Sequence, residues 1–203
     1  MIILIACFLF LGNIWFWKDE DGVRHYSNVA PPMGTSVEEM KENRHVYKKI
    51  TSGQNRGHRF RVVKVFDGDT VKVTGLDLTF TIRLAGIDSP EIGYEGRPSQ
   101  PFSQSARQFL RDLVENKKVA VKSHGTGGYN RQLAELFIED TNINLEMIAA
   151  GLAEVYTGRL PKALNADLYR RTEAGAKQRG KGMWTLGASY KSPRQWRKEY
   201  PRK

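Results

Sequence analysis

The stretch RFRVVKVFDGDTVKVTGLDLTFTIRLA, residues 59–85, predicts the fold. Within it, apolar and polar residues alternate and Val, Ile, Phe and Thr are frequent, a pattern typical of half-buried strands. The alternation holds over residues 59–66, 70–74 and 78–85. Asp67-Gly68 and Gly75 stand at the two breaks, and such residues favour tight turns between strands. The stretch therefore predicts a three-stranded antiparallel meander.

The sequence after this meander predicts further strands and three helices. A stripe of apolar residues at helical spacing, from Ala106 to Val114, indicates a helix with one face on a core. Gly151 follows a later apolar segment, at the place where a helix-ending glycine is expected. The expected elements are helices at 103–116, 143–150 and 163–179 and strands at 118–123, 132–139 and 152–156. Strands followed by appended helices predict an α+β fold rather than a parallel βαβ design.

Acidic and basic residues gather around the meander. Asp69 lies at the first turn, Arg83 lies in the third strand, and Asp88 and Glu91 follow that strand. Arg131 comes later, after a glycine-rich loop. Clustered carboxylates suit a hard divalent cation, and paired guanidinium groups suit a phosphate. Singly, each residue also fits a structural role such as turn former or surface charge, but their joint arrangement predicts a metal-assisted phosphodiester site.

The chain also carries an excess of positive charge. It has 32 Lys and Arg residues against 22 Asp and Glu residues, a formal net charge of +10. This excess favours a polyanionic partner such as nucleic acid, although a basic protein unrelated to nucleic acid fits the charge equally well. Residues 187–203 are interpreted as a basic tail in which Tyr190, Trp196 and Tyr200 alternate with Lys and Arg. Such a mixture suits non-specific strand binding, and a solvated tail fits it as well.

The N-terminus carries no charge over residues 1–17. We interpret residues 1–14 as a signal peptide or membrane anchor, because an apolar run of this length is typical of a secretory segment. Export to the periplasm or the medium is therefore expected, with membrane association through the N-terminus as an option. The absence of Lys or Arg before the run departs from the usual signal. The sequence LIAC at residues 4–7 also resembles a lipobox, in which Cys7 would be lipidated.

Two short regions precede the meander. Residues 15–32 are interpreted as a small β-hairpin module around an Asp-Gly turn. Its pattern resembles a short N-terminal module common in exported bacterial proteins, whose function does not carry over. His25 within it fits a structural role better than that of metal ligand or base. Residues 33–57 are polar and predict a linker with a short helix at 36–43.

From residue 58 to residue 186 the chain resembles the staphylococcal nuclease (thermonuclease) family. The resemblance rests on four motifs in family-like order, and any one of them alone is weak. They are VFDGDTV at 65–71, RLAGIDSPE at 83–91, YNRQLA at 129–134 and AGLA at 150–153. The family implies a five-stranded OB-fold β-barrel with three helices. It also implies a nuclease domain at 58–186.

The resemblance assigns a role to each acidic residue. Asp69 and Asp88 match the family's calcium-binding carboxylates, and Ser89 stands where a backbone carbonyl reaches the ion. Glu91 matches the catalytic glutamate, which acts as general base or positions the attacking water. Asp67 has no such match, and we interpret it as the residue that closes the turn and presents Asp69.

The resemblance also implies how substrate is bound. Arg83 and Arg131 match the two arginines that hold the scissile phosphate. Tyr129 keeps a family tyrosine in the loop before Arg131. Tyr156 and Arg159 stand near two positions at which the family carries nucleotide-stacking tyrosines. Tyr156 is shifted by one residue from the first position, and Arg159 replaces the tyrosine at the second. The base preference is therefore left open.

The sequence is consistent with two functional classes. The first is a calcium-dependent nuclease, expected to be a monomer, that hydrolyses DNA and RNA with little sequence preference. The second is a non-catalytic OB-fold module that only binds nucleic acid. Glu91 favours the first class, because a protein that only binds has no need of a general base.

Overall fold

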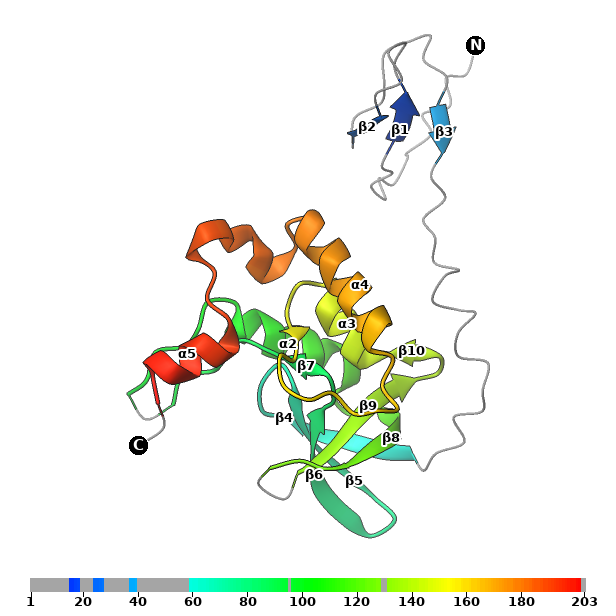
Figure 1. Cartoon of the computed structure of the whole chain (residues 1–203). Helices are drawn as coiled ribbons and strands as arrows, with labels where there is room; N and C mark the ends of the chain where they lie inside the picture. The colour runs from blue at the N-terminus through cyan, green and yellow to red at the C-terminus, as the bar shows by residue number, and fades with distance from the viewer. Residues whose placement is uncertain are drawn as a thin grey trace, which may run out of the picture. The chain divides into compact units, whose positions relative to one another are not determined.

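The structure is a computed structural model of the chain, and it divides into two units, Met1–Gly53 and Gln54–Lys203 (Figure 1). It describes residues 59–94, 96–128 and 131–201, together with the backbone of three strands nearer the N-terminus. The leader expected at residues 1–14 lies outside the described residues. In the part of the chain that is described, no helix is both long and apolar enough to cross a bilayer.

The first unit contains an antiparallel sheet with the strand order β2-β1-β3. Its strands are β1 (Trp15–Lys18), β2 (Arg24–Ser27) and β3 (Val37–Glu39). β1 and β2 pair as the two arms of a hairpin, as the Asp-Gly turn predicts. β3 lies where the sequence predicts a linker with a short helix at 36–43, and this helix prediction is wrong because β3 pairs with β1. An edge strand can be held by backbone hydrogen bonds alone, so its sequence need not alternate.

The second unit is built on a closed five-stranded barrel (Figure 1). Its strands are β4 (Arg59–Val65), β5 (Thr70–Gly75), β6 (Leu78–Leu84), β8 (Lys118–Thr126) and β9 (Gln132–Ile138). β4, β5 and β6 form the predicted antiparallel meander, and β6 pairs in parallel with β9. β8 pairs with both β4 and β9, which closes the barrel, and the short β10 (Thr141–Asn142) extends β9. The predicted α+β barrel is therefore confirmed.

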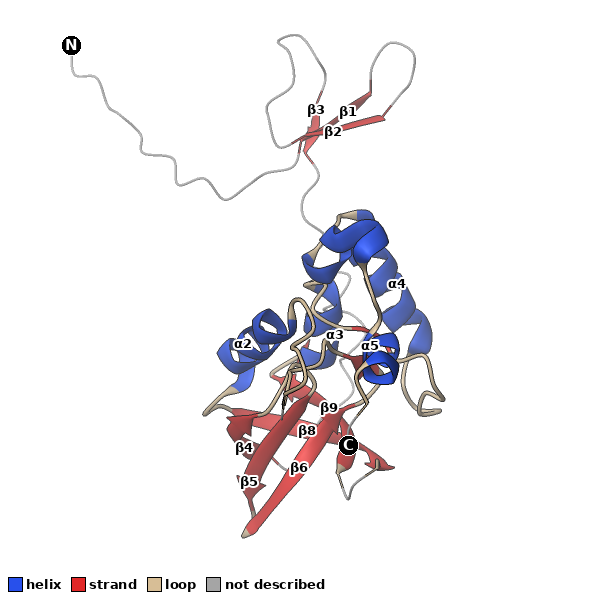
Figure 2. Ribbon diagram, turned by 90° about the vertical axis from the view of Figure 1, so that its left-hand side faces the viewer, coloured by secondary structure: helices blue, strands red, loops and turns tan. Residues whose placement is uncertain are grey.

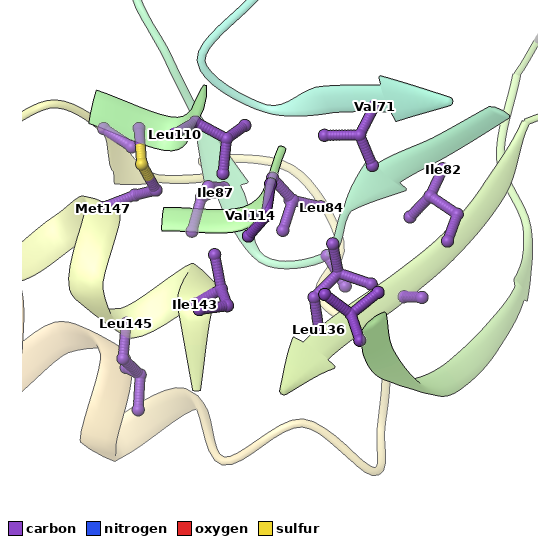
Figure 3. Packing of buried hydrophobic residues seen from close by; sticks show 14 of the residues in the cluster. Val71, Ile82, Leu84, Ile87, Leu110, Val114, Leu136, Ile143, Leu145 and Met147 are labelled. Atoms are coloured by element: carbon purple, nitrogen blue, oxygen red, sulfur yellow. The ribbon is translucent and has the colours of Figure 1, made fainter. Parts of the chain in front are cut away.

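Alternation along the meander directs one side of each strand into the barrel. Val71 on β5 lies opposite Ile82 on β6, and both are fully buried. Leu84 and Leu136 continue this core toward the helices, as Figure 3 shows. Arg83 stands between Ile82 and Leu84, so its side chain points to the opposite face of the strand. The pattern that buries the core thus also places Arg83 outside it.

The helices gather at one end of the barrel (Figure 2). They are α2 (Ser103–Val114), α3 (Ile143–Ala149) and α4 (Ala166–Gln178), which confirms the three predicted helices. α3 begins at Asn142, whose side chain accepts a hydrogen bond from the Leu145 amide, as an N-cap should. After α3 the chain turns at Gly151 with φ of 69°, a left-handed conformation that favours glycine.

Two smaller elements lie beside the barrel. β7 (Ile87–Asp88) pairs with β11 (Glu154–Val155), and in this pair Asp88 lies opposite Glu154. After α4 the chain forms the 3-10 segment η1 (Gly182–Ser189) and then helix α5 (Pro193–Glu199). Figure 1 shows α5, in red, beside the loop that follows β7. A solvated tail, one of the two alternatives left open for residues 187–203, does not describe this helix, because Arg197 on α5 contacts Asp88 and Glu91 of the folded unit.

Candidate active site

Asp69 is fixed by the turn that precedes β5. Its backbone amide donates a hydrogen bond of 3.0 Å to the Asp67 carboxylate, so Asp67 closes the turn. Its own carboxylate accepts from the Thr70 hydroxyl at 3.0 Å and from the Ser89 amide at 2.9 Å. Asp69 is only 2% exposed. Gly68 allows this packing, because a Cβ at that position would lie 2.8 Å from the Ser89 Cβ.

Arg83 joins Asp69 to a second buried carboxylate. Its guanidinium donates one hydrogen bond to Asp69 Oδ1 and another, of 2.8 Å, to Asp88 Oδ1. Asp88 is 1% exposed and is held in β7 by pairing with β11. The Arg83 side chain is 20% exposed, so its pairing with both carboxylates takes place largely away from water. Two carboxylates from different strands therefore meet at one guanidinium.

Burial and neighbouring charges set the ionisation of this group. Burial raises the pKa of Asp69, but the charge of Arg83 and the hydrogen bonds from the Ser89 amide and the Thr70 hydroxyl together outweigh burial, so the pKa lies below its usual value. Burial lowers the pKa of Arg83, but the charges of Asp69, Asp88 and Asp67 and the hydrogen bond to Asp88 together outweigh burial and raise it. For Asp67, burial and then the charge of Asp69 raise the pKa to about 7. At neutral pH, Asp69 and Arg83 thus form a charged pair, whereas Asp67 is partly protonated.

Glu91 is connected to Asp88 through an arginine that the sequence did not predict. Arg197, on α5, donates to both oxygens of Asp88, at 3.0 and 2.7 Å. The same guanidinium donates to Glu91 Oε1 at 2.6 Å. The Glu91 backbone is held by Gln100, whose side-chain oxygen accepts from the Glu91 amide at 3.0 Å. Asp88 therefore pairs with both Arg83 and Arg197, whereas Glu91 pairs with Arg197.

These groups open onto a cavity of about 620 Å³. Its lining includes Arg83, Glu91, Arg131, Tyr156 and Arg159, all of which the sequence predicts as site residues. Asp69 and Asp88 are connected to this cavity by their hydrogen bonds with Arg83, which lines it. Arg131 precedes β9 and donates from Nε to the Gly128 carbonyl at 3.1 Å. Tyr129 lies outside the described residues.

The position of the Tyr156 ring depends on Gly158. Tyr156 is 40% exposed, and a Cβ at residue 158 would lie 2.4 Å from its ring, so Gly158 is required for this ring position.

Ser89 donates its amide hydrogen to Asp69, while its carbonyl is the group that the sequence predicts as a metal ligand. Within the described residues, no group of three acidic, His or Cys side chains is close enough together to hold a metal ion by itself.

The donor set nevertheless fits a hard cation. Calcium takes oxygen ligands from carboxylates, backbone carbonyls and water, and needs six to eight of them. Asp69 and Asp88 supply carboxylate oxygens that meet at one guanidinium, which shows that their common neighbourhood accepts positive charge. A cation here would complete its ligands with carbonyl, water or phosphate oxygens.

The sequence contains a signal for the helix that carries Arg197. Ser192, Pro193 and Gln195 form a capping box with proline in the first turn, a pattern typical of a helix start. The Ser192 hydroxyl accepts from the Gln195 amide, and the Gln195 side chain accepts from the Ser192 amide. This pattern predicts a helix, but it does not predict which surface the helix contacts.

The closed barrel gathers carboxylates and arginines around one cavity, a combination of groups that fits a phosphate-bearing substrate. Comparison with known proteins agrees: residues 81–186 match the family described as "Staphylococcal nuclease homologue". The chain belongs to this family, and the predicted resemblance is confirmed. Residues 2–44 match a "Domain of unknown function (DUF4124)", a range that includes the described strands β1, β2 and β3.

Similar proteins named "Probable endonuclease LCL3" occur in fungi. One from Candida albicans is 34% identical over 207 residues, which cover 94% of this chain and 85% of the relative. One from Candida tropicalis is 29% identical over 98% of this chain and 88% of the relative. A third, "Probable endonuclease lcl3" from Penicillium rubens, is 28% identical over 86% of this chain and 70% of the relative. The similarity to the first two thus extends over nearly the whole chain.

Proposed function

We propose that this protein, a nuclease by family, uses calcium to hydrolyse phosphodiester bonds of DNA and RNA with little sequence preference. The observation that carries the proposal is the pairing of Asp69 and Asp88 with one guanidinium, beside Glu91, on the wall of a single cavity. The family and the names of the relatives support a nuclease. The donor chemistry supports calcium.

Asp69, Asp88 and the Ser89 backbone carbonyl would hold the ion. When bound, calcium would neutralise charge on a phosphate oxygen and help fix the phosphate for attack. The burial of both aspartates supports this role, because a rigid pair of carboxylates loses little freedom on binding. The turn at Asp67 and the β7–β11 pairing supply that rigidity.

Glu91 would act as general base, or orient the water that attacks the phosphorus. Its side chain lines the cavity, so water and substrate can reach it. A carboxylate within hydrogen-bond reach of a water can take its proton as the new bond forms. Gln100 fixes the Glu91 backbone from both sides: its side chain accepts from the Glu91 amide, and its own amide donates to the Glu91 carbonyl at 2.8 Å. This places the base at a defined position on the cavity wall.

Arg83 and Arg131 would bind the phosphate and stabilise the charge that develops on it. A planar guanidinium offers two parallel donors to phosphate oxygens, and fixed donors aimed at developing charge contribute strongly to catalysis. Both residues line the cavity that Glu91 lines. Tyr156 and Arg159 would hold the neighbouring nucleotide by stacking or by phosphate contact, with Tyr129 adding a further contact. Contacts of these kinds do not read base edges, which supports low sequence specificity.

One assay distinguishes a nuclease from a protein that only binds nucleic acid. Purified protein is incubated with single-stranded DNA, duplex DNA and RNA, with calcium or with an excess of chelator. We expect chain cleavage with calcium, none with chelator, and recovery when calcium is restored. Binding of all three nucleic acids without cleavage under any condition would instead identify a non-catalytic OB-fold module.

We further propose that the protein is exported and works as a monomer. The uncharged segment at residues 1–17 supports export, with residues 1–14 as a cleaved signal or a retained anchor. Fractionation of cells that express the full chain tests this. Recovery of the protein only in the cytoplasm would contradict it, and size-exclusion chromatography with light scattering measures the oligomeric state.

A further inference from the structure

Helix α5 is fastened to the active-site loop at both ends. Before it, the Gln100 side chain donates to the Lys191 carbonyl at 2.8 Å, and Gln100 is only 5% exposed. After it, Arg97 donates to the Tyr200 carbonyl at 3.3 Å. Gln100 also holds the Glu91 backbone, so the residue that positions the predicted base also anchors α5. The helix is therefore built into the site rather than attached beside it.

Arg197 spans from this helix to the groups that the proposed reaction needs. Its guanidinium contacts three carboxylate oxygens, two on Asp88 and one on Glu91. These are the oxygens with which Asp88 would hold a cation and Glu91 would receive a proton. A guanidinium that forms a bidentate pair with Asp88 and a cation that binds the same oxygens compete for them.

The pairing of Arg197 with Asp88 and Glu91 can be broken at a moderate cost in free energy. The Arg197 side chain is 35% exposed, in contrast to the nearly buried Asp88 that it contacts. Water can therefore reach the guanidinium when it leaves the carboxylates, which lowers the cost of separation. The anchor through Gln100 and Lys191 lies before the helix, so α5 can move while the chain preceding it stays attached, at the cost of the longer Arg97–Tyr200 hydrogen bond after it.

We propose that α5 is an internal competitor for the catalytic carboxylates: in the absence of ligand, Arg197 occupies Asp88 and Glu91, and calcium binding releases the helix. This inference rests on the proposed function, because it takes Asp88 and Glu91 as the cation ligand and the base. Linkage makes the effect reciprocal, so the docked helix weakens calcium binding by the same factor by which calcium weakens docking. The device keeps the site closed where calcium is scarce and opens it where calcium is abundant.

The test combines calcium affinity with the exposure of the helix. Calcium alone is titrated by calorimetry into the full chain, into the Arg197→Gln variant and into the Arg194→Gln variant. Arg194 is exposed on the same helix, so its variant matches the change in charge without touching the carboxylates. If the helix is docked in about nine molecules of ten, Arg197→Gln lowers the calcium Kd about tenfold. Arg194→Gln should change it less than about twofold, because exposed charges are screened by salt.

Hydrogen exchange of the unsubstituted protein supplies a second readout that involves no change of charge in the chain. We expect saturating calcium to accelerate amide exchange in residues 194–199 and to slow it, or leave it unchanged, in the barrel strands. A local gain in exchange on binding a stabilising ion is the signature of a released helix.

Three results would overturn the inference, and they differ in what else they affect. If calcium binds and the protein cleaves DNA, but neither the Kd of Arg197→Gln nor the exchange of α5 changes, the competitor is refuted and the nuclease proposal stands. If Arg197→Gln leaves the calcium Kd unchanged and raises KM for DNA, Arg197 is a substrate ligand instead. If no protein binds calcium or cleaves DNA, the proposed function itself fails.

Discussion

Replacing Arg83 by lysine should separate the catalytic from the structural role of this residue. Arg83 spans two carboxylates, Asp69 and Asp88, with separate nitrogen atoms of one guanidinium. A lysine ammonium keeps the charge but can reach only one of them with good geometry. Arg83→Lys therefore removes one of the two charge-assisted hydrogen bonds that residue 83 makes, and one buried carboxylate keeps only its other partners.

The size of each effect follows from this geometry. A hydrogen bond to a charged group contributes about 1.5–3 kcal/mol, and the 20% exposure of the Arg83 side chain favours the lower end, so we expect a stability loss of about 2 kcal/mol. In a domain of this size that corresponds to roughly 4–8 °C in Tm. Saturating calcium should reduce this loss, because the ion would take over the charge compensation of both aspartates. The rate of DNA cleavage should fall about 100-fold, as when one transition-state donor is removed.

Thermal unfolding with and without calcium, and initial cleavage rates at saturating calcium, measure these effects. Arg111→Lys is the matched control, because Arg111 also forms a two-point contact, with Glu115, but on the exposed face of α2. That control should change Tm and rate little. An Arg83→Lys variant that loses the same Tm with and without calcium, and less than tenfold in rate, would show that Arg83 is only structural.

Two further predictions concern stability. Burial, and then the nearby charge of Asp88, raise the pKa of Glu154 from 4.5 to about 7, although a hydrogen bond from Tyr190 opposes the shift. Because the pKa of Glu154 is higher in the folded than in the unfolded protein, the free energy of unfolding should fall by up to about 3 kcal/mol as pH rises from about 4.5 to 7. Urea unfolding at pH 5 and pH 8 measures this fall, and Glu154→Gln should reduce it. An equal fall in the variant would refute the role of Glu154. For Gly68→Ala, the new Cβ would lie 2.7 Å from the Ala106 Cβ and cannot be relieved by a flexible side chain, so we expect a loss of about 1–3 kcal/mol by the same method. A variant as stable as the original protein would contradict the packing described around Asp69.

The sequence predicts those parts of the fold whose signals are local. The meander follows from the alternation of apolar residues over 59–85, and α2 follows from one apolar stripe. Arg83 could be placed on the outer face of its strand because its neighbours Ile82 and Leu84 had to be buried. The parallel pairing of β6 with β9 and the added strand β3 depend instead on contacts between distant segments, which leave no periodic mark in either segment.

The same distinction applies to the candidate site. Asp69, Asp88 and Glu91 follow turns and strand ends that the sequence reveals, and the family motifs supply their expected roles. Arg197 could not be predicted in this way, because it lies 109 residues after Asp88 and reaches it only when α5 docks. Its basic, aromatic surroundings fit a solvated tail equally well. The role of Gln100 was hidden for the same reason, since it depends on a loop and a helix meeting.

In the proposed reaction, Glu91 activates water at a calcium site formed by Asp69 and Asp88. The most direct test is the initial rate of single-stranded DNA cleavage by Glu91→Gln at saturating calcium, relative to the original protein and to Glu115→Gln. We predict a rate loss of about 100-fold or more for Glu91→Gln, with calcium and DNA still bound, because glutamine can accept no proton. Glu115→Gln should cleave normally, since Glu115 pairs with Arg111 on the surface of α2. A Glu91→Gln protein that cleaves DNA at the original rate would contradict this account.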